Sequence, residues 1–326
     1  MKILSGDVGG TKTRLALLRS MPDKSLEMLS EQYYRNADYP ALEPILQHFL
    51  EHTEAAPEAA GFSLAGPVRG RSCRLTNLPW SIDAGALEQR FGIARVILLN
   101  DLEATAWGIA ALPRSDFHCL QQGQTPATGN RAVIAAGTGL GQAGLFWDGH
   151  RHLPFATEGG HCNFAPGDDL EFALFEFLRN KHAHVSWERV LSGPGLVDLF
   201  HFLLDYRQAR IGITLREKME LGDPAAAIAT CAANDGDVIC IEAMMRFTRL
   251  YGVECGNQAL KQMATGGIYL GGGIAPKIID WLERPVFIEA FREKGAMQPL
   301  MERIPVYVIL NESTALLGPA VHLTTE

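Results

Sequence analysis

Small residues and one carboxylate form a compact cluster near the start of the chain: Gly6, Asp7, Val8, Gly9, Gly10 and Thr11. Glycines, which lack Cβ atoms, let backbone N–H groups close around an anion. The segment is not a Walker phosphate loop, because Thr11 rather than glycine precedes the lysine and no helical pattern follows. We therefore expect the glycines to lie in a tight turn between two antiparallel strands. Lys12, on the second strand, is interpreted as a solvated surface lysine.

A second cluster of the same kind lies near the middle of the chain. Gly137, Thr138 and Gly139 stand between two strand-like segments, 131–136 and 142–147. One such turn could be an ordinary β-turn, because glycine is common in turns. Two copies favour a duplicated domain with a nucleotide in the cleft between its halves. Asp7 is then the candidate for organising Mg²⁺, through water, because this ion keeps most of its hydration.

Two polar residues, Asn100 and Asp101, follow an apolar run typical of a central strand, 95–99. Open α/β sheets bind ligands at this end of their strands. Asp101 could simply cap the helix that follows, a contribution of about 1 kcal/mol, and this role is compatible with catalysis. A carboxylate here could take the proton of a hydroxyl nucleophile during in-line phosphoryl transfer.

Further candidate side chains are Glu158, His161 and Glu188. Two glycines separate Glu158 from His161 and disfavour the helix that a zinc-binding H-E-x-x-H pair needs. On a loop, this pair could bond vicinal hydroxyl groups, although an exposed loop pair without a ligand is the plainer interpretation. Glu188 stands where a helix could begin, and its sequence context leaves a helix-dipole contact and a ligand contact open.

Strand-like and helix-like segments alternate along the chain, which favours an α/β fold. The expected strands are 2–5, 13–18, 61–65, 95–99, 131–136, 142–147, 268–270 and 306–310. The expected helices are 102–112, 170–180, 194–206, 224–233 and 238–262, one that starts near Pro276, and 313–322. We expect the last helix to be interrupted or capped near Gly318-Pro319.

Composition restricts the class of protein. The chain has 326 residues, of which 47% are apolar and 20% charged, as in an ordinary globular enzyme of about two domains. Its net charge of −8 opposes nucleic-acid or anionic-membrane binding. We expect no signal peptide, and no apolar run approaches the roughly 18 residues of a membrane helix. The six cysteines form no C-x-x-C pair, so we expect reduced thiols in a cytoplasmic protein.

Together, these motifs resemble those of bacterial glucokinases, which are sugar kinases of the actin, hexokinase and Hsp70 superfamily. The resemblance is carried, in order, by Gly6 to Thr11, Asn100-Asp101, Gly137 to Gly141, Glu158 to His161, Glu188 to Gly195 and Gly271 to Gly273. It runs from the first strand to the C-terminal helix. Each glycine cluster alone is a weak signal, and their combination is highly specific. The tripeptide Lys12-Thr13-Arg14 is closer to the related repressor/ORF/kinase family, whose cysteine-rich zinc motif does not follow His161.

The resemblance implies phosphorylation of glucose at its 6-hydroxyl by ATP with Mg²⁺, and Asp101 as the catalytic base. The residues that it places on glucose are Asn100, Asp101, Glu158, His161 and Glu188. Those that it places on ATP are Gly6 to Thr11 and Gly137 to Gly139 at the phosphates, and Gly272 and Gly273 at the adenosine. It further implies a homodimer, whose subunit is a duplicated ribonuclease-H-like fold: a small domain, 1–111 completed by 302–326, faces a larger domain, 112–301, across a cleft.

Several alternatives stay open. The sequence does not show which hydroxyl groups are bound, so the sugar could be mannose, fructose or glucosamine. ADP or polyphosphate could replace ATP as the phosphoryl donor. A sugar-responsive regulator of the same superfamily would need a DNA-binding helix-turn-helix, and we expect none before the strand that starts at Lys2. A chaperone-like or filament-forming ATPase would have no use for the Asn-Asp and Glu-x-x-His residues.

Overall fold

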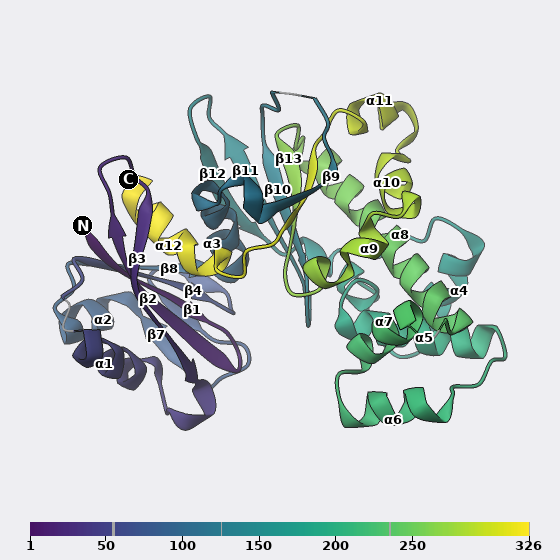
Figure 1. Cartoon of the computed structure of the whole chain (residues 1–326), viewed down its shortest axis with the longest axis horizontal. Helices are drawn as coiled ribbons and strands as arrows, with labels where there is room; N and C mark the ends of the chain where they lie inside the picture. Colours follow the sequence, from purple (N-terminus) through teal and green to yellow (C-terminus); the bar gives the residue numbers. More distant parts are fainter. Residues whose placement is uncertain (54–55, 125, 235, 326) are drawn as a thin grey trace. The chain divides into compact units, whose positions relative to one another are not determined.

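The chain forms two compact units of mixed α/β structure, drawn in Figure 1. The computed structural model describes residues 1–53, 56–124, 126–234 and 236–325. The first unit consists of Met1–Asp116, Leu153–Ala156 and Asn311–Glu326, and the second of Phe117–His152 and Thr157–Leu310.

A five-stranded sheet is the centre of the first unit, in the order β3, β2, β1, β4, β8. Its strands are β1 (Lys2–Val8), β2 (Lys12–Ser20), β3 (Leu26–Arg35), β4 (Ala59–Leu64) and β8 (Arg95–Asn100). β1 runs antiparallel to β2 and parallel to β4, which in turn runs parallel to β8. The short strands β5 (Val68–Arg69), β6 (Ser72–Arg74) and β7 (Ser81–Asp83) form a separate small sheet.

Helices cover both faces of this sheet, because alternate side chains of each strand point to opposite faces. On one face, Leu4 and Leu15 pack in the core that includes α1 (Leu42–Thr53) and α2 (Ala84–Phe91). On the other face, the neighbouring residues Ile3 and Ala16 pack against Leu316 of the C-terminal helix. The central strands β1 and β4 are therefore buried on both sides. The apolar run 95–99, predicted to be a central strand, forms β8 instead, at the edge of this sheet.

The C-terminal helix α12 (Thr314–Thr325) packs against α3 (Asp101–Gly108) at very short range. A Cβ atom on Gly318 would lie 1.9 Å from the carbonyl oxygen of Ala104. The predicted interruption of this helix at Pro319 is wrong, because α12 continues through the proline. The ring costs a backbone hydrogen bond, and burial of the flanking residues Leu316, Ala320 and Leu323 on the sheet compensates for it.

A six-stranded sheet, in the order β12, β11, β10, β13, β14, β9, forms the centre of the second unit, except that residues 153–156 of β12 are assigned to the first unit. Its strands are β9 (Phe117–Gln121), β10 (Arg131–Ala136), β11 (Leu140–Trp147), β12 (His152–Thr157), β13 (Gly267–Gly271) and β14 (Val306–Ile309). β10 runs antiparallel to β11 and parallel to β13, and β13 runs parallel to β14. The order β11, β10, β13, β14 repeats the order β2, β1, β4, β8 of the first unit, so the predicted duplication is present.

Eight α-helices pack in the described part of the second unit. They are α4 (Asp169–Arg179), α5 (Gly193–Tyr206), α6 (Ile213–Leu221), α7 (Pro224–Asn234), α8 (Val238–Gln262), α9 (Ile279–Leu282), α10 (Pro285–Arg292) and α11 (Gln298–Met301). The 25-residue α8 contacts α5, α7, α10 and strand β10, so it is the central helix of this unit (Figure 1). The helix expected from Pro276 begins instead as a 3-10 turn, Ala275–Ile278.

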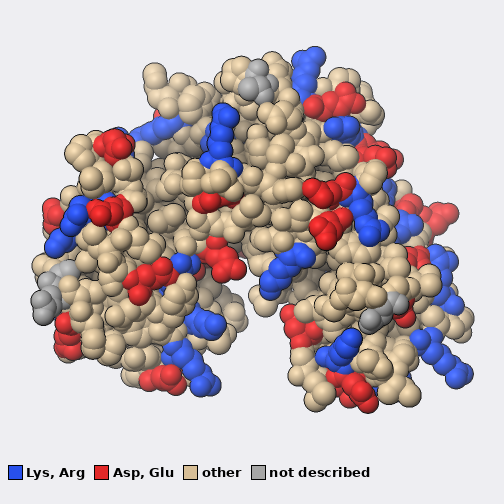
Figure 2. All heavy atoms as spheres, viewed as in Figure 1, with Lys and Arg blue, Asp and Glu red and all other residues tan. Residues whose placement is uncertain are grey.

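Charged side chains of both signs are spread over the surface that Figure 2 shows, and the cysteines are reduced. Basic and acidic side chains are interspersed on the face drawn in Figure 2, without a broad basic area. None of the helices in the described ranges is long and apolar enough to cross a membrane. The six cysteines, all within those ranges, are free thiols.

Candidate functional site

The N-terminal glycine turn joins β1 and β2. It is closed by a hydrogen bond of 3.0 Å from the Gly9 N–H to the Lys12 carbonyl oxygen, and the Lys12 side chain is exposed, as predicted. Gly6, Asp7 and Val8 belong to β1 rather than to the turn, so the expectation that all three glycines lie in the turn is wrong. Gly6 pairs with Leu15 within the sheet, and a Cβ atom there would lie 2.6 Å from the Phe62 ring, which favours glycine at this position. Gly9, Gly10 and Thr11 are the residues that form the turn.

Asn36, which the sequence analysis missed, supports this turn from the end of β3. Its side chain is 2% exposed, donates to the Gly9 carbonyl oxygen at 2.9 Å, and accepts from the Thr13 hydroxyl at 2.7 Å. Its own N–H donates to the Thr11 carbonyl oxygen at 2.9 Å. The turn is therefore fixed before any ligand binds. The signal that could have revealed Asn36 in the sequence is its place, because it is a polar residue directly after a strand.

Asp7 lies near the carboxyl end of β1, beside Ser63 of β4. The Ser63 hydroxyl donates a 2.9 Å hydrogen bond to Oδ1 of Asp7. Burial raises the pKa of this carboxyl, and the Ser63 hydrogen bond and the charge of Arg14 act in the opposite direction. The side chain can therefore take part in binding a cation whose charge would offset the cost of burial.

Asn100 and Asp101 lie at the same edge of the same sheet, because β4 and β8 are parallel and Leu64 pairs with Asn100. The N-cap of α3 is Asn100, so the alternative that Asp101 simply caps the helix does not hold. Oδ1 of Asn100 accepts from the Leu102 N–H at 3.0 Å, and Oδ1 of Asp101 accepts from it at 2.9 Å. The first unit therefore places Asp7 and the pair Asn100 and Asp101 at the carboxyl ends of two parallel strands, β1 and β8, which are separated by β4.

The second glycine turn, Gly137 to Gly139, joins β10 and β11 as predicted. The Gly137 N–H donates to the Gly139 carbonyl oxygen at 2.8 Å, and the Gly137 carbonyl accepts from the Gly193 N–H at 2.8 Å. The carboxylate of Glu188 lies against this turn: its Oε2 accepts from the Leu140 N–H at 3.0 Å. A Cβ atom on Gly139 would lie 2.6 Å from the same Oε2, so only glycine fits here without displacement.

Glu158 and His161 lie on a short 3-10 turn, Gly159–His161, that follows β12. Both side chains are largely exposed, and His161 Nε2 lies 4.0 Å from Glu158 Oε2. The next residues pair with the segment before Glu188, since the Trp187 N–H donates to the Cys162 carbonyl oxygen at 3.0 Å. This pairing brings His161 and Glu188 to one pocket of about 350 Å³. Two of the predicted sugar residues, His161 and Glu188, therefore line one pocket, and Glu158 lies next to His161 outside its lining.

Gly272 and Gly273 follow β13 and lie beside the end of β10. Gly272 has φ +77, and a Cβ atom on it would lie 2.5 Å from the Ala136 carbonyl oxygen. Gly273, Gly137 and Thr138 line a larger pocket of about 930 Å³. Lining residues that the sequence analysis missed include Pro194, Ala225, Ala229, Asn234, Lys277 and Trp281. The alanines of α7, spaced along one helix face, were a usable signal for a surface that leaves room for a ligand.

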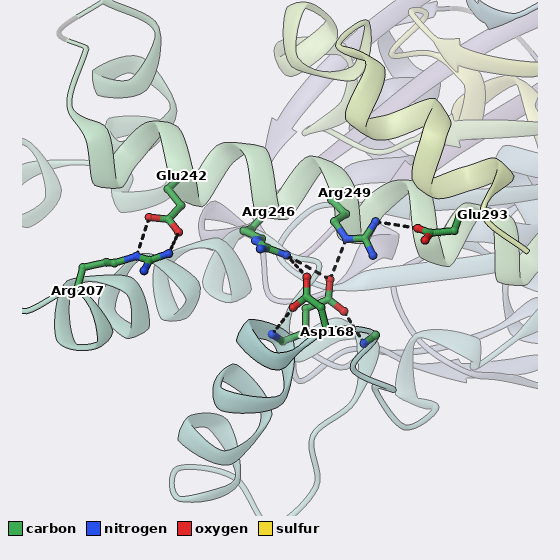
Figure 3. Close-up of polar contacts among 8 residues, drawn as sticks. Asp168, Arg207, Glu242, Arg246, Arg249 and Glu293 are labelled. Atoms are coloured by element: carbon green, nitrogen blue, oxygen red, sulfur yellow. Dashed lines mark hydrogen bonds and ion pairs between the residues drawn. The ribbon is translucent and has the colours of Figure 1, made fainter.

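Ion pairs hold the segment that follows His161 against α8, as Figure 3 shows for Asp168, Arg246 and Arg249. Asp168, the N-cap of α4, pairs with Arg246. Glu171, which is 3% exposed, accepts from Nε of Arg249 at 3.2 Å. Arg249 also bonds Glu293 at 3.1 Å. The charges fix the start of α4, and hence the C-terminal end of the loop that carries His161.

Over the described residues there is no group of three His, Cys, Asp or Glu side chains that could hold a metal ion. Asp7 would therefore have to share a cation with water and with the ligand. This is the manner in which Mg²⁺ is usually bound beside phosphates.

Known proteins similar to this chain are sugar kinases. The glucokinase family model matches residues 4–326. The chain is 40% identical to a glucokinase of Nostoc punctiforme over 98% of this chain and 97% of that protein. It is 36% identical to a glucokinase of Yersinia pestis over 98% of this chain and 95% of that protein. The crystal structure of a glucokinase from an Antarctic psychrotroph superposes with a TM-score of 0.89 at 29% identity, with 100% of this chain and 99% of that chain covered.

The fold is shared more widely. A ROK family glucokinase of Streptomyces griseus, solved in complex with glucose and AMPPNP, covers 99% of both chains with a TM-score of 0.62 at 21% identity.

Proposed function

The chain belongs to the glucokinase family, and from this premise we propose that it transfers the γ-phosphoryl group of ATP to the 6-hydroxyl of glucose. The products are glucose 6-phosphate and ADP. The observation that carries the proposal is the position of Glu188, which accepts a hydrogen bond from Leu140 at the glycine turn and lines a pocket with His161. One carboxylate thus links the proposed phosphate turn to the proposed sugar residues.

Asp101 is proposed as the general base. Its carboxylate stands at a strand end and is oriented by the Leu102 N–H, so that it can accept the proton of the 6-hydroxyl as the oxygen attacks phosphorus. Asn100, Asp101, Glu158, His161 and Glu188 are proposed to bind glucose, because carboxylates, an amide and an imidazole can together pair its vicinal hydroxyl groups.

The nucleotide is proposed to bind at the glycine turns and in the larger pocket of the second unit. Gly6, Asp7, Val8, Gly9, Gly10 and Thr11, with Gly137, Thr138 and Gly139, are assigned to the phosphates. Gly272 and Gly273 are assigned to the adenosine, in line with the place of Gly273 on the wall of the 930 Å³ pocket. Asp7 is proposed to hold Mg²⁺ through water, and the ion would neutralise charge on the phosphates.

Oligomeric state, domains and location are proposed from the family resemblance. We propose a homodimer in the cytoplasm, with domains at 1–111 plus 302–326 and at 112–301. Sedimentation of the purified protein would test the dimer. The free thiols of the six cysteines are compatible with a reducing compartment.

A matrix of phosphoryl donors against sugars tests the proposal. Purified protein would be assayed with ATP, ADP and polyphosphate, each against glucose, mannose, fructose and glucosamine, by a coupled measurement of product. We expect the highest kcat/KM for ATP with glucose. A higher value with another sugar would reassign the substrate, and a lack of turnover in every cell of the matrix would contradict the kinase assignment.

A further inference from the structure

A network of buried polar side chains lies between α8 and β11, outside the residues assigned above. Glu254 is 0% exposed, Gln142 1% and Gln258 2%. Gln142 Nε2 donates to Oε1 of Glu254 at 2.8 Å, and Gln258 Nε2 donates to the same oxygen at 3.1 Å. Gln258 also donates to Oε1 of Gln142. Every one of these amides therefore bonds another member of the network.

The Glu254 carboxylate is also linked, through the amide of Asn257, to the amine of Lys294. Its Oε2 accepts from Asn257 Nδ2 at 2.9 Å, and Asn257 Oδ1 accepts from Lys294 Nζ at 2.8 Å. Burial lowers the pKa of Lys294, and the charge of Glu254 opposes this shift. A buried ionic group of this kind is costly, and apolar residues of the same size often stabilise a fold better. The presence of this network in the core would be explained if the protein requires these side chains to hold one defined geometry.

The turn that carries Glu158 and His161 rests directly on this network. A Cβ atom on Gly159 would lie 1.8 Å from Oε1 of Gln142 and 3.3 Å from Nε2 of Gln258. The backbone carbonyl oxygen of Gln142, on β11, also accepts a hydrogen bond from the hydroxyl of Thr157, at the end of β12, at 3.0 Å. The amide of Gln142 thus forms the surface on which the turn packs.

The other end of the same loop is attached to the same helix. Asp168 and Glu171 pair with Arg246 and Arg249, which lie about one and a half to two turns before Glu254 on α8 (Figure 3). The loop from Thr157 to Asp168 is therefore fixed by side chains of α8 at its C-terminal end and, at its N-terminal end, by Gln142, which bonds Glu254 of α8. The exposed residues Glu158 and His161 lie between these two attachments.

We propose that Glu254, acting through Gln142 and Gln258, is a positioning residue that sets the Glu158–His161 turn in its sugar-binding geometry. The test of this inference by the KM for glucose rests on the proposed function. In Glu254→Gln one of the two acceptor oxygens becomes an N–H₂ group, which then faces either the amides of Gln142 and Gln258 or the amide of Asn257, so donors oppose each other in the core in either orientation. The turn then loses its fixed support without losing any group that touches the sugar.

The test compares Glu254→Gln with the exchanged pair Gln142→Glu/Glu254→Gln. In the single variant we expect the KM for glucose to rise about tenfold or more, while kcat and the KM for ATP stay within about twofold. In the exchanged pair, the carboxylate at position 142 can accept from both amides, so the KM for glucose should return toward the wild-type value. Failure of the exchange to recover the KM would overturn the inference.

Amide hydrogen exchange provides a readout without any sugar. The N–H groups of His161 and Cys162 donate to the carbonyl oxygens of Glu158 and Gly159 at 3.0 Å each. They should exchange faster in Glu254→Gln than in the wild type and recover in the exchanged pair. Unchanged protection would overturn the inference. If the wild type neither bound nor phosphorylated any sugar, the proposed function would fail, and the exchange result would still decide the inference.

A matched control removes a buried amide elsewhere in the same unit. Gln121 is 6% exposed and bonds the carbonyl oxygens of Met301 and Ile304 and the guanidinium of Arg292. Gln121→Leu should lower the Tm and leave the KM for glucose and the protection of His161 unchanged. An equal rise in KM in this control would show general loosening of the unit and would overturn the positioning role.

Discussion

The hydroxyl of Ser63 donates a 2.9 Å hydrogen bond to Oδ1 of Asp7, a carboxyl whose pKa is raised by burial. Two parallel strands bring these residues together, because Asp7 of β1 pairs with Ser63 of β4. The structure thus holds a buried carboxyl in place without a direct basic hydrogen-bond partner among the contacts described. In the absence of a cation, its ionised form opposes folding at neutral pH.

The first prediction concerns Asp7→Asn. Because the folded-state pKa of Asp7 is higher than its unfolded value of 3.8, its favourable contribution is complete below pH 3.8 and is lost as the pH rises through the folded pKa. The variant should therefore be more stable than the ligand-free wild type at neutral pH and should bind Mg²⁺-ATP more weakly. Urea unfolding and ATP titration measure the two effects.

The gap in stability between the variant and the wild type should narrow as the pH is lowered from the folded pKa of Asp7 toward the unfolded value of 3.8. An Asp7→Asn variant that is less stable at neutral pH, or that binds Mg²⁺-ATP as well as the wild type, would contradict the assigned role.

The second prediction separates two roles of Glu188. In Glu188→Ala the Leu140 N–H loses its acceptor, so we expect the KM for glucose to rise about tenfold or more and the KM for ATP to rise about threefold. In Glu188→Gln the amide oxygen can still accept from Leu140, so only the KM for glucose should change. Steady-state kinetics with each substrate varied would measure both.

Glu176, an exposed residue of α4, provides the control, and Glu176→Ala should behave as the wild type. Identical ATP kinetics in Glu188→Ala and Glu188→Gln would show that the contact with Leu140 does not support the nucleotide turn.

The third prediction tests the larger pocket of the second unit. Ala229 of α7 lines this pocket, so Ala229→Trp should fill it and raise the KM for ATP about tenfold or more, with the KM for glucose unchanged. Titration with a nucleotide analogue gives the affinity directly. Normal ATP affinity in this variant would place the adenosine elsewhere.

The fourth prediction concerns the contact between α3 and α12. Gly318→Ala should destabilise the protein by about 2–4 kcal/mol, because the added methyl group would lie 1.9 Å from the Ala104 carbonyl oxygen. Gly212→Ala is the control: a Cβ atom there meets nothing within 4 Å, so its effect should be about 0.5 kcal/mol or less. Urea unfolding measures both. Equal stabilities of the two variants would mean that α12 does not pack closely against α3.

Much of the fold could be predicted because its signals are local. The two glycine turns, the apolar strands and the 25-residue α8 are each set by the order of neighbouring residues. α6 was missed, since Ile213 and Leu221 are exposed at its ends and the helix shows no clear apolar face. Pro319 misled the prediction, because burial of distant Gly61 against its ring is not visible in the sequence.

The residues of the candidate site likewise fall into those that the sequence could reveal and those that it could not. Asp7, Asn100 and Gly137 stand at strand ends or turns and could be found from spacing alone. The residues that support them could not, because Ser63 is 56 residues from Asp7 and Glu254 is 112 residues from Gln142. Such pairs form only when the sheets assemble. The domain boundaries at 111, 112, 301 and 302 and the assigned residue roles stay predictions.

The most direct test of the account is the turnover of Asp101→Asn with ATP and glucose. The amide keeps the acceptor for the Leu102 N–H and removes the base, so kcat should fall about 10²–10⁴-fold. Glucose affinity, measured by calorimetry, should change little. Glu103→Gln, a neighbouring carboxyl whose pKa is raised by burial, should retain turnover. A wild-type kcat in Asp101→Asn would contradict the assignment of Asp101 as the base in glucose phosphorylation.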